Sequence, residues 1–298
     1  MGSVACWGCG MMVEGRTCFT SMEDAAFGES ALADSLAMVI KGYFDDSSDG
    51  KRERFCAVGG LMGGRAQWFD FEKLWSVATY ELKAPFHSTD CEARRGCCEG
   101  WPSDRCASLM KQLAGIIDRT KLHGVGFVVP VSDYLAVFPN AREYDPYFLA
   151  LKQAIINMAY IGRNTDANGP ADIHLIHEFG SVSHTVLGIF RDLKALKMWP
   201  DSERLKMLSH GDKSLTGLQG ADLVAREAFK HADNIGVRPI RKPLKALKDL
   251  ISFHLWTREC LEYLRDKGGQ DNLVALALWG QGGEKPPQMV RLWREGFQ

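Results

Sequence analysis

Alternating and periodic apolar positions divide the chain into a series of expected strands and helices. Two apolar runs, 37–46 and 54–64, flank the polar stretch SSDGKRE and predict a β-hairpin. Strands and helices then alternate, which favours a mixed α/β sheet covered by helices. Apolar spacing predicts helices over 69–82, 105–122, 146–162, 184–196 and 215–232, and strands over 124–134, 171–179 and 205–210.

The two ends of the chain differ from this central part. Residues 1–36 lack periodicity and predict an irregular N-terminal extension, so the folded domain is expected over 37–235. Residues 236–298 are expected to form a C-terminal helical extension, because apolar residues over 244–264 recur at helical spacing. The glycine pair Gly59-Gly60 predicts either a backbone held close to a neighbour or a bend.

Composition limits the classes of partner. The 298 residues are 46% hydrophobic and 24% charged, as in a soluble globular protein, and the net charge of -1 leaves nucleic-acid binding to a local patch. The basic residues Arg238, Arg241, Lys242 and Lys245 suit phosphate contacts, and a solvated linker and helix face explains them equally well. The apolar runs are shorter than the ~20 residues of a membrane span, so no membrane partner is expected.

Nine cysteines are spread through a chain that shows no targeting signal, which favours a reducing, cytoplasmic environment. Cys6-x-x-Cys9 has the spacing of a zinc ligand pair, with Cys18 nearby. A second group lies in one loop region and consists of Cys91, Cys97, Cys98 and Cys106. A second CxxC or HxxxH motif is missing, so unligated thiols are the expected state and structural Zn²⁺ is the less favoured alternative.

Three acidic residues follow, or lie within, elements that should be buried. Asp45 lies near the end of the first strand, Glu178 ends the strand IHLIHE, and Asp222 lies in the helix LTGLQGADLVARE. An aspartate at a strand end is usually a turn former. However, strand ends and a packed helix can converge, and three carboxylates at one point would need a cation, for which Mg²⁺ or Mn²⁺ is suitable.

Two motifs carry a family resemblance. YFDDSSDG resembles the opening Tyr-x-Asp-Glu-Ser-Gly strand of the family called domain of unknown function 3800, and LQGADLVA resembles its closing helix. The resemblance covers 38–232 and implies a ribonuclease H-like fold, in which strand and helix acids bind divalent metal for phosphodiester hydrolysis. It assigns Asp45 and Asp222 as metal ligands, with Glu178 as the best match for the central-strand acid and Asp133 as its rival. Asp46 and Ser48 depart from the family's usual Glu and Gly.

The expected function is therefore a metal-dependent nuclease acting on RNA, DNA or a hybrid. The alternative is a non-catalytic module on the same fold that binds nucleic acid or a phosphorylated ligand. His87, Asp90 and Glu92 are candidates for a further ligand or a proton-transfer group, and Gln219 for orienting a ligand or capping its helix. Asp46 should point to the opposite face from Asp45. The sequence is also compatible with a homo-oligomer.

Overall fold

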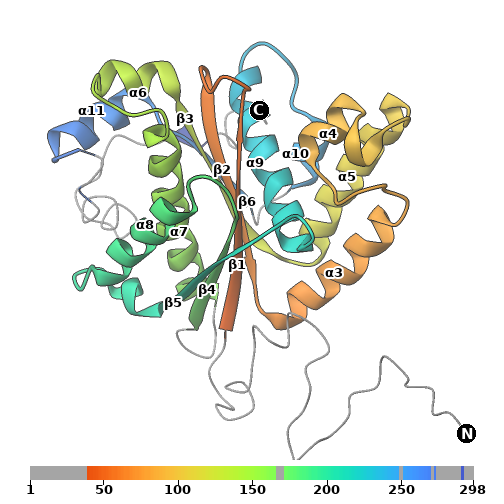
Figure 1. The fold of residues 1–298 in the computed structure, drawn as a ribbon, viewed down its shortest axis with the longest axis horizontal. Helices are drawn as coiled ribbons and strands as arrows, with labels where there is room; N and C mark the ends of the chain where they lie inside the picture. The colour runs from red at the N-terminus through yellow and green to blue at the C-terminus, as the bar shows by residue number, and fades with distance from the viewer. Residues whose placement is uncertain (1–38, 166–170, 248–250, 270–271, 273–289, 292–298) are drawn as a thin grey trace, which may run out of the picture.

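A seven-stranded mixed sheet runs through the middle of the molecule (Figure 1). The structure is a computed structural model that describes residues 39–165, 171–247, 251–269, 272 and 290–291. The strand order is β5-β4-β1-β2-β3-β6-β7. The strands are β1 (Val39–Ser48), β2 (Phe55–Gly63), β3 (His123–Pro130), β4 (Asp172–Glu178), β5 (Leu205–Gly211), β6 (Ile251–Leu255) and β7 (Val290–Arg291).

Helices cover both faces of the sheet (Figure 1). One face carries α6 (Val131–Val137), α7 (Asp145–Thr165), α8 (Ser183–Ala195) and α11 (Arg258–Asp266). The other carries α3 (Arg65–Thr79), α4 (Ser88–Ala93), α5 (Ser103–Arg119), α9 (Thr216–Asn234) and α10 (Lys242–Ala246). Two short 3₁₀ helices are η1 (Gly96–Cys98) and η2 (Pro200–Arg204). The predicted mixed α/β sheet flanked by helices is confirmed. None of the described helices has the length and apolar character needed to cross a membrane.

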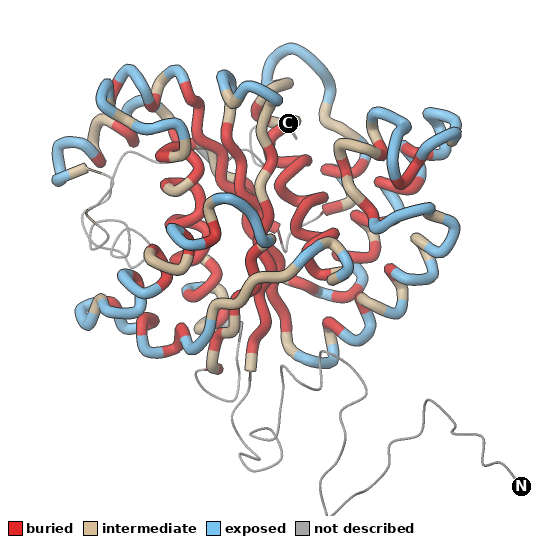
Figure 2. Tube along the Cα trace, in the orientation of Figure 1, coloured by how far each residue is buried: buried red, intermediate tan, exposed pale blue. Residues whose placement is uncertain are grey.

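The strands alternate their side chains between two cores, as their twofold period requires. Phe44 packs in the core under α7, whereas its neighbour Tyr43 packs in the core under α3, α5 and α9. The central strands are buried along most of their length, and exposed backbone concentrates in the connections (Figure 2). A residue's position in β1 therefore determines which helical layer its side chain meets.

Helix α9 packs close to the sheet because there is a glycine on each side of the contact, Gly59 in β2 and Gly217 in α9. A Cβ atom on Gly59 of β2 would lie 2.2 Å from the backbone nitrogen of Ala225 in α9. A Cβ atom on Gly217 would lie 2.5 Å from the ring of Tyr43. Of the two alternatives predicted for the Gly59-Gly60 pair, close approach of a neighbour is the one found at Gly59. This contact brings the middle of α9 to the end of β1.

The structure differs from the predicted elements in two places. The expected helix over 244–264 is wrong, because β6 lies within it and pairs parallel with β3 between α10 and α11. Residues four apart lie on one face of a strand and also on one face of a helix, so Ile251 and Leu255 fit both. Phe253, two residues from each, is buried, which fits only the strand. The strand expected over 124–134 ends earlier, at Pro130, and α6 begins at Val131. The N-terminal extension and its Cys6, Cys9 and Cys18 lie outside the described residues.

Candidate functional site

Two neighbouring parallel strands bring Asp45 and Glu178 together. β1 and β4 pair in parallel with Phe44 opposite His177, so the next residues of the two strands, Asp45 and Glu178, are also adjacent. Both side chains alternate to the face that α9 covers, since Tyr43 and Ile176, two residues earlier, belong to its core. Asp45 is buried, whereas the side chain of Glu178 is 35% exposed. The pair thus forms a site that opens to solvent beside Glu178.

Asp222 reaches the same point from the middle of α9. One of its carboxylate oxygens, Oδ2, accepts the backbone N–H of Ser88 at 2.6 Å. The other, Oδ1, lies 3.6 Å from Nε2 of His87, whose Nδ1 lies 3.4 Å from Oδ2 of Asp90. His87 is 40% exposed and Asp222 only 5%. The segment at the start of α4 therefore supplies a half-exposed imidazole, with a carboxylate on either side, next to the buried acids.

Lys213 is the residue that sequence reasoning missed. Its ammonium forms an ion pair with Oδ2 of Asp45 and lies 3.5 Å from Oε2 of Glu178 and 3.5 Å from Oδ1 of Asp222. It comes from the turn between β5 and α9, where an isolated lysine gives no sequence signal that separates it from a solvated turn residue. The three predicted carboxylates thus surround a single positive charge.

The acids and the ammonium of this cluster shift one another's pKa values. Burial raises the pKa of Asp45 well above its ordinary value, Asp222 and Glu178 raise it further, and Lys213 opposes them. Burial alone would lower the pKa of Lys213, but Asp45, Asp222 and Glu178 outweigh burial and raise it. The three ion-pair partners of the ammonium are carboxylates, whose oxygens are the type of ligand that Mg²⁺ and Mn²⁺ take.

Gln219 ties together the segments that carry the cluster. Its Oε1 accepts a hydrogen bond from Nε1 of Trp75 at 2.8 Å and from the backbone N–H of Phe86 at 3.2 Å. Its Nε2 donates to the carbonyl oxygen of Lys213 at 2.8 Å. Gln219 does not cap α9, since the N-cap position is Leu215. It instead holds the backbone just before His87 and at Lys213 against the turn of α9 that precedes Asp222.

Glu92 and Arg241 contact each other rather than the carboxylate cluster. Glu92 accepts from Nε of Arg226 at 2.9 Å, and its other oxygen lies 2.5 Å from Nη2 of Arg241. The same Arg241 nitrogen lies 3.0 Å from the buried carboxylate of Glu227. The guanidinium groups lower the pKa of Glu92 despite its burial. The three other predicted phosphate-binding residues are exposed, and they are Arg238, Lys242 and Lys245.

Two other acids lie away from the cluster. Asp133 is in the first turn of α6, after β3, and β2 separates β3 from β1, so Asp133 is two strands from Asp45 whereas Glu178 is on the adjacent strand. Asp46 lies 4.0 Å from Nη2 of Arg52 and is 35% exposed. The structure therefore places Glu178, and not Asp133, beside Asp45.

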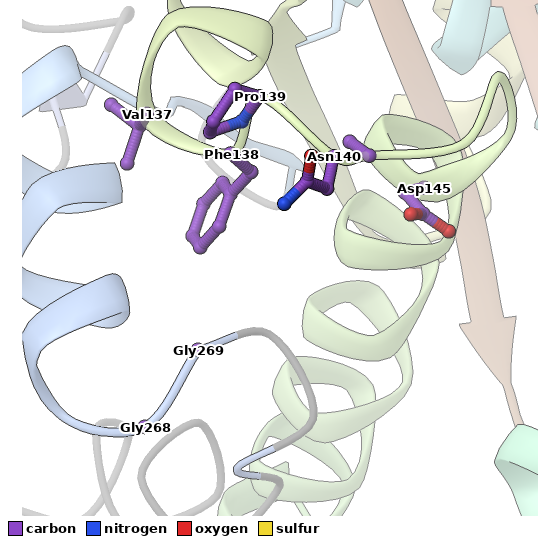
Figure 3. A pocket seen from close by; sticks show the side chains of 8 residues that line it. Val137, Phe138, Pro139, Asn140, Asp145, Gly268 and Gly269 are labelled. Carbon is purple, nitrogen blue, oxygen red and sulfur yellow. The ribbon is translucent and has the colours of Figure 1, made fainter.

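A cavity of about 320 Å³ lies elsewhere, between the α6–α7 connection and the end of α11 (Figure 3). Its one acid, Asp145, is buried and accepts the backbone N–H of Arg142 at 2.8 Å. Its lining consists of Val137, Phe138, Pro139, Asn140, Ala141, Asp145, Gly268 and Gly269. None of the candidate acids described above lines this cavity.

Fold and site define an α/β protein with a mixed sheet and a carboxylate cluster at the ends of its central parallel strands. Among solved structures, a single-substitution mutant of Bst-RNase HIII is similar with a TM-score of 0.41 and 12% identity, over 69% of this chain and 58% of that chain. Bst-RNase HIII in complex with Mn²⁺ is similar with a TM-score of 0.38 and 14% identity, over 70% and 60%. The chain thus spans about three fifths of each neighbour. At these identities and TM-scores, the comparison is limited to the path of the chain and assigns no function to this protein.

Neither the family models nor the curated proteins compared with this chain give a match. The resemblance to domain of unknown function 3800 therefore rests on the two sequence motifs and stays a prediction.

Proposed function

We propose that the protein is a divalent-metal-dependent nuclease in which Asp45, Glu178 and Asp222 hold Mg²⁺ or Mn²⁺. The observation that supports this proposal is the convergence of the three carboxylates on one positive charge, the Lys213 ammonium. Three acids that approach one ammonium, two of them buried, are stabilised as anions by a cation at that position. The three groups that approach that charge are carboxylates, and carboxylate oxygens are ligands of hard divalent ions.

The proposed roles of the residues are cation binding, by the three acids, and proton transfer, by His87. Asp45 and Asp222 are held in place by backbone N–H groups, those of Asp46 and Ser88. Glu178 is on the exposed side, where a phosphate group of the substrate can approach. Divalent metal bound here would activate water and stabilise the charge that develops on the phosphate and leaving oxygens.

His87 is suited to proton transfer at the same site. Its imidazole lies between the carboxylates of Asp222 and Asp90 and is 40% exposed. Asp90 orients the ring through Nδ1, so Nε2 is directed to the cluster. Imidazole is the side chain that most often serves as a general acid or base when it lies within reach of the reacting groups.

The substrate backbone would be held by the exposed basic residues Arg238, Lys242 and Lys245. These contacts are sequence-independent and weaken with salt. Arg241, proposed with them from the sequence, has its guanidinium within 2.5 Å of Glu92 and 3.0 Å of Glu227, so we assign it to holding α10 and α4 on α9. The first experiment should determine whether the substrate is RNA, DNA or a hybrid.

The test is a metal titration with labelled RNA, DNA and hybrid substrates. Cleavage should require Mg²⁺ or Mn²⁺ and fall roughly 1,000-fold in Asp45→Ala, since metal-bound charge stabilisation is worth several kcal/mol. Asp46→Ala is the matched control, because Asp46 is the next residue on β1 and faces away from the cluster. Equal activity of the parent and Asp45→Ala at every metal concentration would reject the proposal.

A second function has one observation in its favour. Lys213 already places a positive charge among the three acids, as a permanent internal counter-ion would. The protein would then be a non-catalytic module that binds nucleic acid or a phosphorylated ligand. Binding of all three nucleic acids without metal, with no cleavage at any metal concentration, would favour this function.

A further inference from the structure

Four buried cysteines come together where α4, η1 and α5 meet. Cys91, Cys97, Cys98 and Cys106 are each at most 3% exposed, and all four are free thiols. The Sγ atoms of Cys91, Cys98 and Cys106 all lie within 4.8 Å of one another. The Sγ atom of Cys97 lies 3.8 Å from that of Cys98.

These distances suit a tetrahedral zinc site. Zn–S bonds of about 2.3 Å place tetrahedral sulfur ligands roughly 3.8 Å from one another. The three mutually close sulfurs therefore need only small side-chain rotations to reach one ion, and Cys97 is already at ligand spacing from Cys98. A set of thiols without carboxylates selects Zn²⁺ over Mg²⁺ or Mn²⁺.

The segment that carries these cysteines has little regular structure to stabilise it. α4 has 6 residues and η1 has 3. Arg94 between them, Gly96 at the start of η1 and Gly100 after η1 have positive φ. Helices of this length are unstable alone, and a structural metal is one device that fixes such segments. Buried thiols can also pack as small apolar side chains, but packing alone does not require three sulfur atoms to lie within 4.8 Å of one another with a fourth 3.8 Å from one of them.

Two of the cysteines, Cys91 and Cys97, also contact the backbone of His87. The carbonyl oxygen of His87 accepts the backbone N–H of Cys91 at 2.9 Å and lies 3.7 Å from Sγ of Cys97. The neighbouring Ser88 N–H binds Asp222. An ion held by the thiols would thus fix the segment that places His87 beside the carboxylate cluster.

We propose that Cys91, Cys97, Cys98 and Cys106 bind one structural Zn²⁺ ion, separate from the carboxylate cluster. Four Zn–S bonds form as four S–H bonds break, and the protons pass to buffer. The zinc site does not depend on the proposed nuclease activity.

The first test is the metal content of the full chain purified with zinc in the medium and without chelator. One zinc per chain is expected in the parent and in the controls, Cys56→Ser and the Cys6→Ser/Cys9→Ser double variant. Cys98→Ser and Cys106→Ser should lose the zinc. A zinc-free parent, or zinc that is retained in Cys98→Ser and lost from the N-terminal double variant, would overturn the assignment.

A second measurement covers the case in which a cysteine variant does not fold. The Cys6→Ser/Cys9→Ser double variant is made metal-free and titrated with Co²⁺. Thiolate-to-cobalt charge-transfer bands and tetrahedral d–d bands should rise together and saturate at one equivalent. Cobalt bound by carboxylates gives no thiolate band, so the absence of charge transfer in this folded protein would contradict the proposal.

Discussion

Replacing Lys213 with methionine removes the positive charge among the three acids and keeps much of the side chain's length. The Lys213 side chain is 17% exposed, and those of Asp45 and Asp222 are 3% and 5% exposed. Removing one partner of a buried ion pair costs about 3–5 kcal/mol. Partial exposure of Lys213 places the expected loss near the lower end, about 3 kcal/mol. At 2–4 °C for each kcal/mol, the unfolding temperature in chelator should fall by roughly 6–12 °C.

Divalent metal should reverse most of that loss. A metal ion bound by Asp45, Glu178 and Asp222 supplies the charge that Lys213 supplied, and binding at 100 times Kd adds about 2.7 kcal/mol of stability. If the proposed metal binds at the carboxylates, the ammonium would compete with it in the parent, so Lys213→Met should bind Mn²⁺ more tightly and gain more stability from it. Thermal unfolding, followed by circular dichroism in chelator and along a Mn²⁺ titration, measures both effects.

Lys242→Met is the matched control, because Lys242 is exposed and should change stability by less than about 0.5 kcal/mol with or without metal. If Lys213→Met loses the same stability in chelator and in saturating Mn²⁺, the ammonium does not occupy the metal position. That result would favour the binding module, with Lys213 as a permanent counter-ion.

The remaining predictions concern the surroundings of the cluster. Burial, partly offset by Arg241, raises the pKa of Glu227 from 4.5 to about 7, so the folded state holds a proton that the unfolded state releases between these values. Stability should therefore fall by about 3 kcal/mol as pH rises through this window, and Glu227→Gln should remove that fall in denaturant unfolding measured from pH 4 to 8. Gly59→Ala should destabilise the fold by at least about 1–3 kcal/mol in the same assay, because its Cβ atom would lie 2.2 Å from the backbone nitrogen of Ala225. Gly188→Ala in α8 has nothing within 4 Å of the new Cβ atom and should not destabilise; equal losses in the two variants would contradict the packing explanation.

Periodic apolar positions were sufficient to predict the sheet and the helices around it. The prediction worked where one period was clear, as in β1, β2 and α9. It was wrong over 244–264, because residues four apart satisfy both a helix and a strand, and the sheet position that decides between them is a long-range contact with β3. The local sequence does not indicate that β6 pairs with β3.

The candidate acids illustrate the same limit. Asp45, Glu178 and Asp222 were selectable because each interrupts or ends an apolar run, and the structure brings them together. The sequence left Glu178 and Asp133 as rivals, since the order of strands in the sheet was unknown, and that order places only Glu178 on the strand next to β1. Lys213 was not predictable, because two of its three partners, Asp45 and Glu178, come from strands distant in sequence.

The most direct test of the central claim is single-turnover cleavage by Asp222→Asn across a Mn²⁺ titration. Asparagine has the shape of aspartate and can still accept the Ser88 N–H, so the change removes charge at the cluster and little else. The account predicts a folded protein whose cleavage rate is roughly 1,000-fold below the parent at saturating metal. Parent-level, metal-dependent cleavage by Asp222→Asn would contradict it.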